Sequence, residues 1–184
     1  MTTLHIGPQK NNTWSIKLPD RAWRLVSIPL VNSSGLSVLF KSIEGQFGRV
    51  LCYCPDDTSC PWKEYNPNKP GYLSELTVLD NSMGFWLNLS APAAAGTIEL
   101  AVSGFNATTT KILLRAGWNL IGYPSMTPRK VSDVFKGIKY DYIQGFNATA
   151  PHYIVNLPSA YMMKPGEGYW VHATAEAVLT VNWS

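Results

Sequence analysis

Three closely spaced cysteines carry the most distinctive chemistry in this sequence. Cys52, Cys54 and Cys60 lie in CYCPDDTSCPWKEYNPNKPGY, a segment rich in Pro, Asp and Asn. Such a loop is costly in entropy to order, and one disulfide would stabilise it by about 2 to 3 kcal/mol by restricting the unfolded chain. Cys54–Cys60 and Cys52–Cys60 are the feasible closures, because Cys52 and Cys54 share one face of a strand and a bond between them would be strained. We therefore expect one disulfide, with the third thiol buried or paired with another molecule.

Free thiols and metal binding are the alternatives for the same segment. The three cysteines and a histidine would make four zinc ligands, but C-x-C-x5-C is not a common zinc pattern and no histidine lies in the loop. Asp56 and Asp57 could supply oxygen ligands to calcium, yet the alternating D-x-D-x-D-G pattern is missing. We expect a solvated turn there, with no metal and no other cofactor.

No arrangement of catalytic residues stands out. His5, His152 and His172 form no H-x-x-x-H or H-E-x-x-H motif. The sequence also lacks a G-x-S-x-G nucleophile elbow and the glycine-rich motifs that bind phosphates. A glycosidase needs two carboxylates about 5 to 10 Å apart, and nothing in the sequence indicates that any two of the 12 acidic residues face one cleft. We therefore expect a protein that is not an enzyme, with a hydrolase as the least favoured function.

Charge and hydropathy narrow the classes of partner. Only 15% of residues are charged, against about 25% in an average soluble domain. The net charge of +3 comes without a dense basic run, so nucleic acid is not an expected partner. The uncharged stretch 85–98 contains Asn, Ser, Pro and Gly and is too short and too polar to span a bilayer.

The motif Asn-x-Ser/Thr points to an extracellular location. It occurs six times, where the composition alone predicts roughly two occurrences. The glycosylation candidates are Asn11, Asn32, Asn88, Asn106, Asn147 and Asn182. The alternative is a surface rich in Asn, Ser and Thr in a host that does not glycosylate it. Both interpretations favour a polar, uncharged surface of the extracellular or cell-surface type.

Two segments of the chain carry nearly the same residues. RAWRLVSIP at 21–29 resembles RAGWNLIGYP at 115–124, with Trp23 and Trp118 separated by 95 residues. LSVLFKSI at 36–43 and VSDVFKGI at 131–138 keep that spacing. GFWL at 84–87 and GYWV at 168–171 recur at a spacing of 84, so the first copy has 11 extra residues, around the cysteine segment. Such internal repetition predicts two similar structural units.

The repeated segments predict the elements of each unit. In GWNLIGYP, Trp118 and Leu120 face one way and Asn119 and Ile121 the other, which is the period of a strand. VSDVFKGI has apolar residues at i, i+3, i+4 and i+7, typical of a short helix, and KPGEGYWV combines a turn with an aromatic strand. We predict a mainly β protein with two tandem, pseudo-symmetric β-sandwich or barrel-like domains, each with one short helix. The domains are 1–105, with a cysteine-containing insertion near 52–72, and 106–184, packed about an approximate twofold axis.

The aromatic residues divide into two groups by recurrence. A residue that recurs in both copies is expected in a shared core, because aromatic side chains dominate burial in small β domains. This places Trp23, Trp118, Trp86 and Trp170 in the structural core. The aromatic residues that do not recur are better candidates for stacking on the apolar faces of sugars, and these ligand-binding candidates are Trp62, Tyr65, Tyr72, Tyr142 and Tyr153.

The segments AGWNLIGYP, VSDVFKGI, KPGEGYWV and VLTVN resemble the GWNLI/GYW repeat modules found near the C-termini of many secreted and cell-surface bacterial or archaeal proteins. The resemblance covers 112–183 well and 16–103 less closely, because Trp23 follows Ala22 without a glycine and Arg24 replaces Asn119. It implies an accessory piece of a larger surface protein and transfers no catalytic residue.

These observations together predict a non-catalytic extracellular β module that acts in adhesion, scaffolding or cell-envelope assembly. The alternative is a carbohydrate-binding module that uses the loop aromatics. The expected partners are other domains of a larger surface protein, or a surface glycan or protein, with no nucleic acid and no membrane span.

Overall fold

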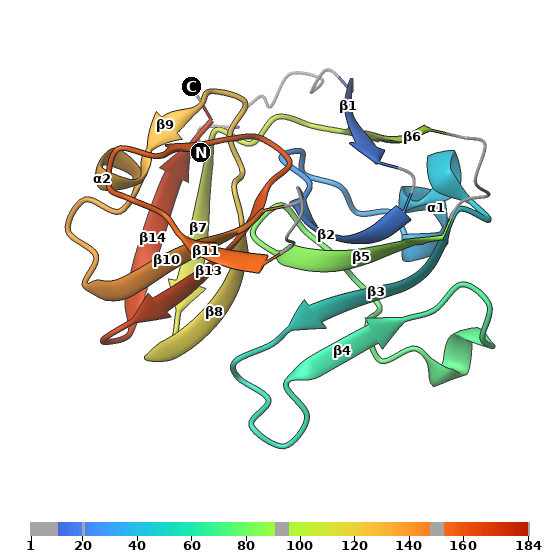
Figure 1. Ribbon diagram of the computed structural model, residues 1–184, viewed down its shortest axis with the longest axis horizontal. Coiled ribbons are helices and arrows are strands. Elements are labelled where there is room, and N and C mark those ends of the chain that lie inside the picture. The colour runs from blue at the N-terminus through green and yellow to red at the C-terminus, as the bar shows by residue number, and fades with distance from the viewer. Residues whose placement is uncertain (1–10, 20, 91–95, 148–152, 184) are drawn as a thin grey trace, which may run out of the picture.

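Antiparallel strands make up most of the chain in the computed structural model, which describes residues 11–19, 21–90, 96–147 and 153–183 (Figure 1). The first half contains β1 (Asn12–Pro19), β2 (Arg21–Ser27), β3 (Phe47–Tyr53), β4 (Trp62–Tyr65), β5 (Gly84–Ser90) and β6 (Thr97–Gly104). The second contains β7 (Thr109–Leu114), β8 (Gly117–Gly122), β9 (Arg129–Lys130), β10 (Tyr140–Asn147), β11 (Tyr153–Asn156), β12 (Met162–Met163), β13 (Gly168–Ala173) and β14 (Ala177–Asn182).

The two halves share one sheet topology, to which the second half adds a two-stranded sheet of β9 and β12. A four-stranded antiparallel sheet has the order β2-β5-β3-β4 in the first half and β8-β13-β10-β11 in the second, so corresponding strands hold corresponding places. Each sheet faces a two-stranded ribbon, β1-β6 or β7-β14. One short α-helix lies in each half, α1 (Leu36–Leu39) and α2 (Val131–Val134), and 3-10 turns occur at Lys41–Ile43 and Gly71–Leu73. The predicted mainly β class, with one short helix in each half, is confirmed.

Each half buries its own hydrophobic core between the sheet and the ribbon. Alternation along the strands produces it: in β6, Ile98, Leu100 and Val102 are buried and the residues between them face outward. The first core draws its buried residues from Trp14 to Val102 and the second from Ile112 to Val181. The predicted domain boundary at 105/106 lies between Val102, the last buried residue of the first core, and Ile112, the first of the second.

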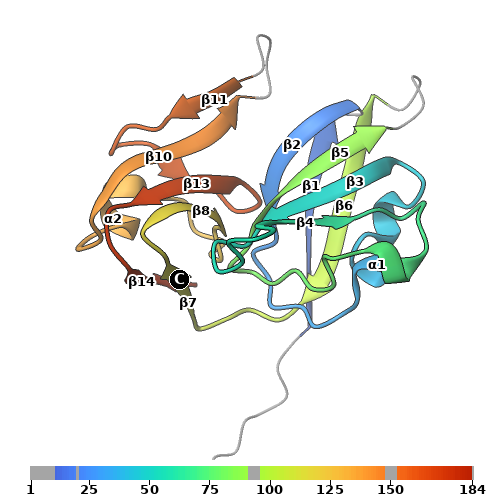
Figure 2. The ribbon, with the colours of Figure 1, turned by 90° about the horizontal axis from the view of Figure 1, so that it is seen from below.

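Two backbone hydrogen bonds join the halves in the same way. Ser27 N–H donates to the carbonyl of Gly166 at 2.9 Å, and Gly122 N–H donates to the carbonyl of Ser82 at 2.8 Å. Ser27 and Gly122 are 95 residues apart, and Ser82 and Gly166 are 84 apart, which are the two spacings of the sequence repeat. Exchanging the halves therefore exchanges the two bonds, as a pseudo-twofold relation requires. Figure 2 shows the two four-stranded sheets on either side of this junction.

Candidate functional site

The four recurring tryptophans do not lie in either core, so this part of the sequence-based prediction is wrong. Trp118 is 37% exposed and Trp23, Trp86 and Trp170 are half-buried. The reason is strand alternation. In β5 and β13 the preceding aromatic residue is the buried one, Phe85 at 0% or Tyr169 at 1%, so the tryptophan after it must face the opposite side of its sheet.

On that outer face the tryptophans form one T-shaped pair in each half. The ring centroids of Trp23 and Trp86 are 6.4 Å apart with an interplanar angle of 85°. Those of Trp118 and Trp170 are 6.1 Å apart at 89°. Edge-to-face geometry is favourable because the positive edge of one ring meets the negative face of the other. The two pairs occupy equivalent positions of the sequence repeat and have nearly the same geometry.

One ring of each pair also contacts an aromatic residue of the other half. Trp86 meets Phe146 at 5.0 Å and 78°, and Trp170 meets Tyr53 at 5.2 Å and 61°. Phe146 lies on β10 and Tyr53 on β3, which are corresponding strands. The aromatic contacts across the junction thus repeat the pseudo-twofold relation of the backbone hydrogen bonds.

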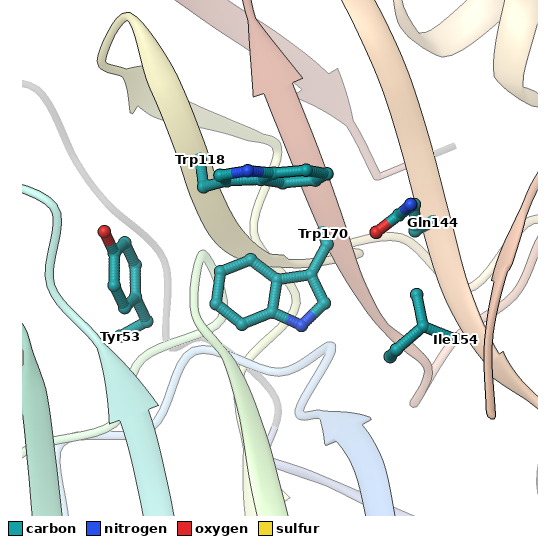
Figure 3. Close-up of a pocket in the computed structure, with 5 residues that line it drawn as sticks. All are labelled: Tyr53, Trp118, Gln144, Ile154 and Trp170. Atoms are coloured by element: carbon teal, nitrogen blue, oxygen red, sulfur yellow. The ribbon is translucent and has the colours of Figure 1, made fainter. Parts of the chain in front are cut away.

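Two hollows lie over these pairs, and we call them the first pocket and the second pocket. The first pocket, of about 490 Å³, is lined by Ala22, Trp23, Leu51, Trp62, Trp86 and Phe146. The second pocket, of about 280 Å³, is lined by Tyr53, Trp118, Gln144, Ile154 and Trp170 (Figure 3).

The two pockets correspond position by position. Leu51 and Gln144 are equivalent, because each pairs with the β5 or β13 tryptophan of its own half. Trp62 and Ile154 are equivalent, because each is the partner of the aromatic residue that crosses to the other half. Trp62 of the first pocket also lies 5.7 Å from Trp170 of the second, so the pockets adjoin.

Polar groups distinguish the second pocket from the first. The amide nitrogen of Gln144 donates to Asn156 Oδ1 at 2.8 Å, which leaves the carbonyl oxygen of Gln144 turned towards the indoles (Figure 3). The hydroxyl of Tyr53 is also at this pocket. The corresponding positions in the first pocket are Leu51 and Phe146, which carry no polar side-chain atom.

A second group of side chains flanks the second pocket at Trp118. The ring of Tyr142 is stacked on Trp118 at 6.4 Å and 18°, and the ring of His172 meets Trp118 at 5.0 Å and 68°. His172 Nδ1 lies 3.0 Å from Asp141 Oδ2, which fixes the orientation of the imidazole. The exposed indole is therefore held in place by its neighbours on β10 and β13.

The predicted ligand-binding aromatics are only partly brought together. Trp62 lines the first pocket and is 41% exposed, and Tyr142 stacks on Trp118 at the edge of the second. Tyr153 is exposed on β11 and Tyr72 is 86% exposed, but neither lines the first or the second pocket. Tyr65 packs against Phe40 and the first core. The recurring tryptophans were not identified as site residues from the sequence. Trp86 and Trp170 each follow an aromatic residue that is buried, and this order along the strand is the signal that they face outward.

The predicted disulfide is also wrong, because Cys52, Cys54 and Cys60 are all free thiols. Cys52 is buried in the first core, where its sulfur lies 3.4 Å from the carbonyl oxygen of Gly84, and Cys60 is exposed. Hydrogen bonds close the loop instead. Cys54 N–H donates to the carbonyl of Pro61 at 2.7 Å, so the loop is ordered without a covalent link.

Asp57 organises the interior of the same loop. Its carboxylate accepts hydrogen bonds from Lys63 Nζ at 2.6 Å, Ser59 Oγ at 2.7 Å and the backbone N–H of Cys60 at 3.0 Å. These hydrogen bonds, of which that from Lys63 has the largest effect, hold the pKa of Asp57 well below its ordinary value. Nearby, a hydrogen bond with the Cys52 thiol and the charge of Lys63 lower the pKa of Cys54 to about 7 against the opposing effect of desolvation.

The loop also reaches the second half, which explains its place beside the second pocket. Arg115 forms ion pairs with Asp56 of the loop and with Glu176 at 2.9 Å. Tyr53 precedes the loop and Trp62 follows it, and both rings contact Trp170. Tyr53, with Trp62 packed beside it, therefore forms one wall of the second pocket. Because Trp62 is equivalent to Ile154 and Gly84 to Gly168, most of the extra residues of the first copy lie between Trp62 and β5 rather than in this loop.

The glycosylation candidates differ in exposure. Asn11, Asn106 and Asn182 are exposed, whereas Asn32, Asn88 and Asn147 are half-buried. Asn88 lies within β5, paired with strands on both sides. The motifs of Asn147 and Asn182 extend into residues outside the described part of the chain.

No catalytic or metal centre is evident in the described residues. His5 and His152 lie outside them, and His172 is engaged with Asp141. Within the described ranges, no group of three or more His, Cys, Asp or Glu side chains could hold a metal ion. No helix in this part of the chain has the length and apolar character needed to cross a membrane.

Comparison with protein-family models, with curated proteins and with solved structures finds no match to this chain. The resemblance to GWNLI/GYW modules therefore stays a prediction, and the case for function depends on the geometry of the pockets.

Proposed function

We propose that this protein is a non-catalytic recognition module of an extracellular or cell-surface protein, and that it binds its ligand in the two adjoining pockets between the two halves. Adhesion, scaffolding and envelope assembly all require such a rigid binding surface. The observation that carries the proposal is the duplicated tryptophan pair on the outer face of each sheet, with partly exposed rings.

Joining the two halves does not account for all of these rings. Trp86 and Trp170 contact aromatic residues of the opposite half and so hold the junction together. Among the described residues, Trp23 and Trp118 make ring contacts only within their own half. Grouped apolar side chains at a surface mark interaction sites, and tryptophan is enriched among the residues that dominate binding energy.

Composition and sequence motifs support the extracellular setting. The six Asn-x-Ser/Thr motifs and the low content of charged residues fit a secreted or surface-displayed protein. Exposed Asn11, Asn106 and Asn182 are the positions most accessible to a glycosyltransferase. Other domains of a larger surface protein, a surface glycan or a surface protein remain the proposed partners.

A binding array tests this function. The labelled protein is applied to immobilised envelope glycans and extracellular proteins, beside the variants Trp118→Ala and Trp86→Ala/Trp170→Ala. Tyr72→Ala is the matched control, because it removes a far more exposed aromatic ring that lies at neither pocket. We expect at least one retained partner, weakened about tenfold or more by the tryptophan substitutions and unaffected by the control.

Two outcomes would contradict the proposal. One is that every partner bound by the wild-type chain is bound equally by both tryptophan variants, with circular dichroism showing that the variants are folded. The other is that the bound partner is cleaved by the protein, which would make it an enzyme.

A further inference from the structure

The structure assigns the second pocket, lined by Tyr53, Trp118, Gln144, Ile154 and Trp170, as the site for one pyranose ring of a β-linked, gluco-configured glycan chain. This inference rests on the proposed function and names its ligand class. The first pocket holds the same aromatic framework without the polar groups, so the two pockets provide an internal comparison.

The shape of the second pocket matches a flat ring with apolar faces. Figure 3 shows Trp170 face-on at its centre, with the other four side chains around it. A β-gluco-configured pyranose has equatorial hydroxyls, so both of its faces present only C–H groups. These weakly positive hydrogens complement the negative face of an indole. Trp118, at 89° to Trp170, forms an upright wall rather than a second floor.

The polar groups of the second pocket are of the kinds that pair with equatorial hydroxyls. Gln144 directs its carbonyl oxygen towards the indoles, because its amide nitrogen is engaged with Asn156. Among the described residues, the hydroxyl of Tyr53 and the indole N–H groups of Trp118 and Trp170 have no hydrogen-bond partner. The pocket thus offers one acceptor, the Gln144 carbonyl, two donors, the indole N–H groups, and the Tyr53 hydroxyl, which can do both. This set suits a ligand that carries several hydroxyl groups, because each hydroxyl both donates and accepts.

An apolar partner fits this pocket less well. An aliphatic or aromatic protein side chain would cover the Gln144 carbonyl and the Tyr53 hydroxyl without offering them a hydrogen bond, and burying such groups unpaired is unfavourable. The first pocket carries no such penalty, because its equivalent residues are Leu51 and Phe146. The difference between the pockets therefore favours a sugar ring in the second pocket over the first.

Nuclear magnetic resonance of the indole N–H groups tests the assignment. The chain has seven tryptophans, and single Trp→Phe variants assign their Nε1–H signals. Cellohexaose and chitohexaose are titrated up to about 5 mM, a range suited to weak single-site binding, with mannohexaose, whose axial hydroxyl interrupts one face, as the comparison sugar. We expect the signals of Trp118 and Trp170 to move most, with tighter binding of the gluco-configured chains.

Variants make the test specific to the polar groups. Gln144→Leu gives the second pocket the apolar residue that the first pocket has at this position, and it should weaken binding about tenfold, whereas Tyr72→Ala should leave it unchanged. Leu51→Gln places the polar residue in the first pocket, at a half-buried position, and should make the Nε1–H signals of Trp23 and Trp86 respond to the same sugars.

Several results would overturn the assignment. These are no shift of any indole signal with the gluco-configured hexasaccharides, shifts confined to Trp23 and Trp86 in the wild type, or unchanged binding by folded Gln144→Leu. A protein partner retained on the array and lost in Trp86→Ala/Trp170→Ala would leave the proposed recognition function intact while the sugar assignment failed. The two failures are therefore distinguishable.

Discussion

Ala22 and Gly117 share an unusual backbone conformation at the start of equivalent strands. Gly117 precedes Trp118 with φ of 96°, and Ala22 precedes Trp23 with φ of 77°. In the second half the buried side chain of Asn119 holds this turn by hydrogen bonds to the backbone of Arg115 and Gly117. The first half keeps the conformation although its residue is not glycine, so the strain falls on Ala22.

Substituting these two residues should therefore have opposite effects. A side chain in the left-handed region costs about 1 kcal/mol relative to glycine. We expect Gly117→Ala to lower the free energy of unfolding by about that amount, and Ala22→Gly to raise it by up to about 1 kcal/mol. Urea denaturation followed by tryptophan fluorescence measures both. A lower urea midpoint for Ala22→Gly would show that the positive φ is not a source of strain.

Gly84 and Gly168 should tolerate no side chain at the junction. A Cβ on Gly84 would lie 2.5 Å from the carbonyl oxygen of Ile121, and a Cβ on Gly168 would lie 2.8 Å from that of Val26. Because these are backbone atoms of the opposite half, the clash can be relieved only by separating the halves. We expect each Gly→Ala change to cost about 1 to 3 kcal/mol, measured by thermal unfolding. Gly71→Ala is the control, since nothing lies within 4 Å of its added Cβ, and equal losses in all three variants would contradict the close approach.

Adjacent aromatic residues of one strand should differ in their contribution to stability. Phe85 is fully buried, whereas Trp86 is half-buried on the other face of β5. We expect Phe85→Ala to cost about 3 to 5 kcal/mol and Trp86→Ala less than half as much. The same order is expected for Tyr169 and Trp170. Urea midpoints measure these losses of stability. A larger loss for the tryptophan than for its neighbour in either pair would show that the indole is a core residue.

Cys54 should react with alkylating reagents at lower pH than an ordinary thiol. The hydrogen bond with Cys52 and the charge of Lys63 lower its pKa to about 7, and only the thiolate is nucleophilic. The rate of iodoacetamide labelling, followed by peptide mass spectrometry, should be half-maximal near pH 7 and should fall as the pH decreases below that value. Lys63→Met should move the midpoint upward. A midpoint that stays at the value of a free cysteine would refute this assignment.

Particular residues show why some features were predictable and others were not. The spacing of 95 residues between Trp23 and Trp118 revealed the duplication, and the strand and helix periods revealed the mainly β class, because both are patterns of the linear sequence. The same recurrence placed Trp86 and Trp170 in the core, since sequence does not say which face of a strand is covered. The cysteine spacing suggested a disulfide, but Asp57 and the hydrogen bond between Cys54 and Pro61 order the loop instead.

The sequence by itself determined that this chain is built from two copies of one strand-and-helix unit, because periodicity and repetition are properties of the linear chain. Only the tertiary structure decided where the tryptophans lie. The ribbon covers one face of each sheet, and the opposite half approaches the other. That approach, fixed by the backbone contacts of Gly84 and Gly168, leaves the indoles lining two adjoining pockets.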